Sequence, residues 1–298
     1  MKKIKDSRAA SFLIIAIVYV IAAAAGIAVY LALPLDWWIR LLIADVVATV
    51  VTFAFSCIFG NSSVYDPYWS VQPIVIIVAY AVGCGQLNAM RILLLISICF
   101  WGIRLTANWA YTFKNLNAQD WRYSSLKEQN GKLYPLINFI GIHMMPTMIV
   151  YCCVLPVAYS FTFDVQANVG SIIFTILAVA AATMQAIADI QMHAYRRHRN
   201  GNFIRSGLWK YSRHPNYLGE ILMWWFVGLT VVVADLNAWY LLSGAVFNTL
   251  LFLVISIPLA EGRQSKKEGF EEYKAQTRML LPIYKRQYPS TTKDVKNA

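Results

Sequence analysis

The sequence predicts an all-α membrane protein, a polytopic helical bundle of about seven or eight transmembrane helices. Of its 298 residues, 58% are hydrophobic and only 14% are charged, whereas soluble domains carry roughly 25% charged residues. The mean hydropathy is +0.51, and the apolar residues form runs that approach the roughly 20 residues needed to span a bilayer. The net charge of +11 fits the Lys and Arg excess of cytoplasmic loops in membrane proteins. It therefore gives no reason to expect nucleic-acid binding.

Eight apolar segments are candidate spans. The first directly follows a basic N-terminus, is longer than the apolar core of a signal peptide and lacks a clear cleavage site, so we expect a signal anchor. The third is the shortest. In chain order the segments are 11–33, 38–59, 70–85, 91–112, 135–158, 169–192, 217–234 and 238–260.

The connections between these segments differ in charge. Nearly all Lys and Arg lie in the N-terminus, the loops 113–134 and 193–216, and the tail after Glu261, whereas the other turns lack them. Eight spans place every basic segment on one side, so we expect both termini in the cytoplasm and the protein in a bacterial inner membrane. We further expect an N-terminal transmembrane hairpin over 1–60, a bundle over 61–286 and a disordered tail over 287–298.

Polar residues inside three of the expected spans form helical faces. An ionisable group in a span costs roughly 2.5–3.5 kcal/mol on insertion scales, so each is a candidate site residue. Asp45 and His143 are isolated and are interpreted as packing groups. The other polar residues recur at helical spacing near the basic ends of their spans: Gln185, Asp189, His193 and Arg196; Arg213, Asn216 or Tyr217, and Glu220; Arg104, Asn108 and Tyr111. These faces predict a polar cavity open to the cytoplasm. The alternative is that these residues pair with one another and only hold the bundle together.

The basic loop "YRRHRNGNFIRSGLWKYSRHP" (195–215) has two interpretations. It can be a topology signal that contacts lipid headgroups, or a loop whose arginines bind phosphate. The chain has no Rossmann, Walker A, HExxH, CxxC or GxSxG motif. Its five Cys show no metal-ligand spacing, so no metal is expected. Any cofactor must therefore be held by the bundle itself.

Several stretches resemble the steroid 5α-reductase superfamily, in particular its bacterial branch of proteins of unknown function. They are "NSSVYDPYWS" (61–70), "QDWRY" (119–123), "YSRHPNYLGE" (211–220) and "EGFEEYKAQTRMLLPIY" (268–284), so the resemblance covers roughly 60–285. The stretch "RHPNY" and a similar tail also occur in membrane methyltransferases of the isoprenylcysteine carboxyl methyltransferase type.

The reductase resemblance implies a bundle that binds NADPH from the cytoplasmic side and reduces a carbon–carbon double bond conjugated to a ketone. Asn216, Glu220, Asp189, Arg196 and Arg104 match cofactor-binding positions of that superfamily, and Gln185 stands where the animal enzymes have Asn. Together with their polar neighbours, the expected cofactor-binding residues are Arg104, Asn108, Arg122, Gln185, Asp189, Arg196, Tyr211, Arg213, His214, Asn216, Tyr217 and Glu220.

The substrate end departs from the superfamily. Its Gln-Glu pair cannot be placed here, and Glu261 and Arg263 occupy the region of a late His and Tyr. A donor must stabilise the developing enolate oxygen, and Tyr65, Asp66 and Tyr68 are the candidate catalytic residues. The expected partners are an apolar substrate from the bilayer and membrane lipids, with no obligate protein partner.

Two other functions stay open. One is a methyltransferase that uses S-adenosylmethionine, with His214 near the methionine part and Glu261 on the substrate side. The other is a transporter, which inverted repeats or broken helices in matching halves would favour; the sequence shows neither.

Overall fold

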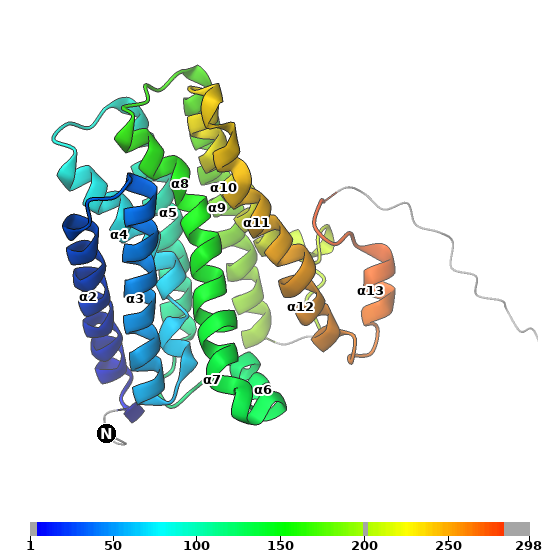
Figure 1. The fold of residues 1–298 in the computed structure, drawn as a ribbon. Helices are drawn as coiled ribbons and strands as arrows, with labels where there is room; N and C mark the ends of the chain where they lie inside the picture. Colours follow the sequence, from blue (N-terminus) through cyan, green and yellow to red (C-terminus); the bar gives the residue numbers. More distant parts are fainter. Residues whose placement is uncertain (1–4, 199–201, 283–298) are drawn as a thin grey trace, which may run out of the picture.

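The computed structural model describes residues 5–198 and 202–282, and within these residues it is all-helical, as predicted (Figure 1). The long helices pack side by side in one bundle, and the short helix α13 lies outside it, at the right of the view in Figure 1. The helices are α2 Arg8–Ala32, α3 Trp37–Phe59, α4 Tyr68–Gly83, α5 Ala89–Thr112, α6 Trp121–Asn130, α7 Tyr134–Ile137, α8 Met145–Thr162, α9 Val169–Arg197, α10 Pro215–Val232, α11 Ser243–Leu251, α12 Ile257–Gln264 and α13 Phe270–Gln276. The expected tail 287–298 lies outside the described residues.

Within the described residues, six helical stretches are long and apolar enough to cross a membrane, which confirms the membrane prediction. They are α2, α3, α5, the continuous run Trp121–Thr162, α9 and the run Leu236–Gln264. The expected spans 70–85 and 217–234 correspond to α4 and α10, which lie in the same bundle (Figure 1). The total of seven or eight spans stays a prediction.

Local sequence signals explain where these helices begin and end. Asn168 and Ser171 form a capping box at the start of α9, which satisfies backbone N–H groups that have no partner within the helix. Gly60, with φ of 63°, ends α3 in the left-handed conformation that glycine adopts without strain. Pro215 occupies the first turn of α10, where its missing N–H costs no hydrogen bond.

The core lies where α5, α8, α9 and α10 meet. Trp101, Val154, Ala182, Met223 and Val227 are fully buried there or nearly so. Helices α9 and α10 approach so closely that a Cβ atom on Gly219 would come within 2.7 Å of the Ala181 carbonyl oxygen. This close approach brings the polar side chains on the two helices within hydrogen-bonding distance.

Two short π-helical segments interrupt the bundle, Asn138–Met144 before α8 and Phe252–Ser256 between α11 and α12. π-Helical turns are rare in proteins, and many of those that occur lie at functional sites. The first one contains His143, which is fully buried and shares a hydrogen bond of 3.0 Å between its Nδ1 and the Asn138 carbonyl oxygen.

Candidate functional site

Glu220 on α10 is a buried carboxylate, only 2% exposed. Its Oε2 accepts hydrogen bonds of 2.8 Å from Trp101 Nε1 on α5 and from Gln185 Nε2 on α9. Its Oε1 accepts a third, of 2.9 Å, from Trp224 Nε1 one turn along α10. Three helices thus meet at one carboxylate. The predicted residues Gln185 and Glu220 are brought together, whereas the two tryptophans were not predicted.

One helical turn from Glu220 along α10, Asn216 belongs to a second polar group. Arg104 NH1 on α5 forms a salt bridge of 2.8 Å with Asp189 Oδ2 on α9, and both side chains are nearly buried. Asn216 Nδ2 donates a hydrogen bond of 3.5 Å to Asp189 Oδ1. The predicted Arg104, Asp189 and Asn216 therefore lie together on α5, α9 and α10. With Gln185 and Glu220 one turn away, they are called the array below.

The polar faces of α5 and α9 also line a groove of about 360 Å³. His193 Nε2 and Asn108 Oδ1 share a hydrogen bond of 2.6 Å, and Arg197 donates to the hydroxyl of Tyr111. The predicted Asn108 therefore pairs with His193 within this groove.

Arg213 and His214 form a separate cluster with Glu261 on α12. Arg213 Nε donates a 2.8 Å hydrogen bond to Glu261 Oε1, and His214 Nε2 lies 3.1 Å from the same oxygen. Arg213 also donates to the backbone carbonyl oxygens of Lys274 and Thr277. Burial lowers the pKa of His214, and the hydrogen bond to Glu261 opposes this shift. The structure thus places Arg213 against the C-terminal segment.

The other predicted cofactor residues lie around these groups. Tyr217 stacks on the His214 ring, with the ring centroids 5.2 Å apart. Arg122 is half exposed and forms a salt bridge of 2.9 Å with Asp120. Arg196 and Tyr211 are exposed, and within the described part of the chain no hydrogen bond or salt bridge joins either of them to the array.

Two of the three predicted catalytic residues face the bundle interior, where they join a chain of hydroxyl groups. Tyr68 donates a 3.2 Å hydrogen bond to Asp45 Oδ1, and Thr49 donates to Tyr68. The Thr147 hydroxyl shares hydrogen bonds with Thr49, at 3.0 Å, and with Tyr65, at 2.8 Å. Asp45, interpreted from the sequence as a group that holds or packs the helices, is bonded to Tyr68, a predicted catalytic residue. Polar spacing along α3 could not predict this hydrogen bond, because Tyr68 lies on α4.

Asp66, the third predicted catalytic residue, contacts α6 instead. Its Oδ1 accepts a 2.7 Å hydrogen bond from Tyr123 on α6. Burial raises the pKa of Asp66 to about 6, with the hydrogen bond from Tyr123 opposing this shift. Its proximity to Tyr123 links the stretches "NSSVYDPYWS" and "QDWRY" in space.

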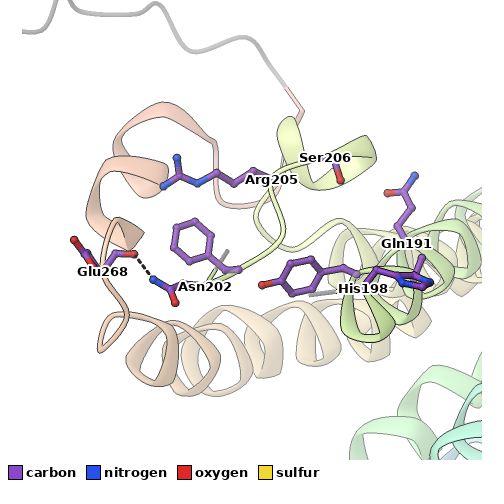
Figure 2. Close-up of a pocket in the computed structure, with 9 residues that line it drawn as sticks. Gln191, His198, Asn202, Arg205, Ser206 and Glu268 are labelled. Atoms are coloured by element: carbon purple, nitrogen blue, oxygen red, sulfur yellow. Dashed lines mark hydrogen bonds between the residues drawn. The ribbon is translucent and has the colours of Figure 1, made fainter. Parts of the chain in front are cut away.

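A cavity of about 680 Å³ lies at the end of α9 (Figure 2). Its lining includes Gln191 on α9 and His198 just after the helix. It also includes Asn202, Arg205 and Ser206 on the following loop, and Glu268. Arg205 is held by a 2.8 Å hydrogen bond to the Gly269 carbonyl oxygen. Among the described residues, no three His, Cys, Asp or Glu side chains are grouped as metal ligands would be.

The fold and this site define a class, helical membrane proteins with a polar array buried among three helices. A family model for proteins of unknown function, DUF1295, matches residues 52–277, and the chain belongs to this family. An uncharacterized protein of Schizosaccharomyces pombe is 26% identical over 193 residues, 55% of this chain and 56% of that protein, so the match spans about half the length of each. No solved structure matches the chain.

Proposed function

We propose that the chain is an integral-membrane, NADPH-dependent reductase of a carbon–carbon double bond conjugated to a ketone. Its substrate is apolar, of a steroid- or lipid-like kind, and enters from the bilayer. The basic ends of the helices, and with them both termini, face the cytoplasm of a bacterial cell. The observation that carries the proposal is the convergence of Gln185, Asp189, Asn216 and Glu220 in hydrogen-bonded groups on α9 and α10.

The residues of the array have the chemistry that this cofactor requires. Several buried polar atoms have no partner among the described residues, namely Gln185 Oε1, Asn216 Oδ1, and Arg104 Nε and NH2. Buried polar groups are normally hydrogen-bonded, so these atoms are available to a polar ligand. The two amide oxygens can accept from a carboxamide, and the guanidinium can donate to phosphate.

The proposed roles follow from these positions. Gln185, Asn216 and the carboxylate of Glu220 would hold and orient the nicotinamide end, and Arg104 and Arg122 would hold phosphate groups. When bound, NADPH supplies the hydride. Asp189 keeps Arg104 in place through their salt bridge, and the packed core around Trp101 excludes water from the array.

The protein must also stabilise the ketone oxygen as negative charge develops on it. A preorganised hydroxyl donor serves this purpose in a site that excludes water. Tyr68 and Tyr65 are buried donors joined through Thr49 and Thr147, so a proton lost at one hydroxyl can be replaced along the chain. Asp45 would fix the orientation of the Tyr68 hydroxyl.

A second candidate function is a methyltransferase that uses S-adenosylmethionine. The observation that favours it is the contact between His214 and Glu261, because these residues were assigned to neighbouring parts of a methyltransferase site. Against it, Glu261 Oε1 is already bonded to Arg213.

Ligand-dependent thermal unfolding of the detergent-purified protein separates the two functions. A ligand at about 100 times its Kd stabilises the folded state by roughly 2.7 kcal/mol, which corresponds to a rise in Tm of roughly 5 °C or more for a chain of this size. We expect this rise with NADPH and none with S-adenosylmethionine. The Asn216→Ala variant should lose it, and the control Asn237→Ala, exposed beyond the end of α10, should retain it. A rise with S-adenosylmethionine alone would refute the reductase proposal.

A further inference from the structure

The groove between α5 and α9 opens toward the lipid. Exposed isoleucines flank it on both helices: Ile103 is 61% exposed, Ile187 44% and Ile190 66%. In a membrane-spanning bundle, apolar side chains exposed at this level face acyl chains. The polar lining of the groove is therefore presented to the bilayer.

The groove changes in chemistry along its length. Arg197 and Tyr111 lie at its basic end, His193 and Asn108 in the middle, and Arg104 deeper in the bundle. From Arg197 to Ala186, which also lines the groove, eleven residues of helix correspond to about 16 Å. The groove thus runs from headgroup level into the upper acyl region, since interfacial and hydrocarbon layers together measure about 40–45 Å across both leaflets.

From this arrangement we propose that the α5–α9 groove is a binding site for an anionic phospholipid of the leaflet at the basic ends of the helices. Arg197 uses one N–H on the Tyr111 hydroxyl and retains others for a headgroup phosphate. The acyl chains lie on Ile103, Ile187 and Ile190.

Charge and size both favour this occupant. Among the described residues that line the groove, Asp189 is the only acid, and it is neutralised by Arg104. The mouth of the groove therefore carries the positive charge of Arg197. The volume of about 360 Å³ is at the low end of the roughly 300–1,000 Å³ of small-ligand sites, which suits a headgroup whose chains remain outside. The proposal does not depend on the reductase activity.

Native mass spectrometry of the detergent-purified chain, titrated with phosphatidylglycerol or phosphatidylcholine, tests it. One basic residue near an anionic lipid surface contributes about fivefold in affinity. We expect tighter binding of phosphatidylglycerol than of phosphatidylcholine, and Arg197→Gln should weaken phosphatidylglycerol binding about fivefold. Tyr111→Phe should weaken it less, because it removes only the hydroxyl that positions Arg197.

The matched control is Lys266→Gln, which removes one exposed cation on the α12–α13 connection and should leave lipid affinity unchanged. Inorganic phosphate and NADPH, each titrated as competitors, identify the source of the bound phosphate. If neither competitor displaces phosphatidylglycerol, the result supports a lipid site. Displacement by either, equal affinity for the two lipids, or an equal loss in Lys266→Gln and Arg197→Gln would overturn the proposal. An unchanged Tm in each variant shows that folding is intact.

Discussion

At the scale of single residues, Glu220 has the most constrained environment on α10. Its two oxygens accept three N–H donors, from Trp101, Gln185 and Trp224, and no cation forms a salt bridge with it among the described residues. Each donor would be left without a partner if the carboxylate were removed, and an unsatisfied buried polar group costs about 1–3 kcal/mol. Glu220 therefore holds α5, α9 and α10 together in addition to its proposed cofactor role.

Glu220→Gln tests this structural role. A glutamine amide must place an NH2 group against at least one of the N–H donors, so we expect the free energy of unfolding to fall by about 1–3 kcal/mol. Denaturant unfolding in detergent, without cofactor, measures the change. The control Glu268→Gln, exposed in the α12–α13 connection, should change it by no more than about 0.5 kcal/mol. Equal effects of the two variants would show that the bonds to Glu220 do not stabilise the bundle.

At the scale of elements, the C-terminal segment packs against the start of α10. Arg213 donates to Glu261 and to two carbonyl oxygens beyond α13 or at its end. Tyr273 donates from its hydroxyl to the Trp209 carbonyl oxygen, and its ring lies 5.1 Å from that of Phe203. The helix α13 has only seven residues and would be marginal alone, so these contacts keep it in place.

Arg213→Lys should release this segment. The planar guanidinium reaches several acceptors at once, which an ammonium group does not reproduce. Hydrogen–deuterium exchange should increase over residues 270–279, with little change in α2 and α3. Lys266→Arg, a conservative change at an exposed site, serves as the control. Unaltered exchange over 270–279 in Arg213→Lys would mean that the packed aromatic rings alone hold α13.

At the scale of the whole molecule, hydropathy and helical periodicity account for much of the fold. Apolar runs predicted the long helices, and the spacing of Gln185 and Asp189 predicted that their side chains would share a face toward Glu220 and Asn216. The position of Arg213 could not be predicted, because its acceptors lie about 50 to 60 residues away in the chain. The pairing of Asp45 with Tyr68 could not be predicted either. It depends on the short turn between α3 and α4, whose geometry periodicity does not specify.

The account's central claim is that NADPH binds at the array around Glu220, and energy transfer from tryptophan to bound NADPH tests it most directly. Transfer falls steeply with distance, and Trp224 is bonded to Glu220, whereas Trp239 is 69% exposed in the segment Leu236–Leu242, beyond the end of α10. The account predicts saturable NADPH emission on excitation of tryptophan, reduced in Trp224→Phe and unchanged in Trp239→Phe at saturating NADPH. Absence of saturable emission, or an equal reduction in the two variants, would contradict it.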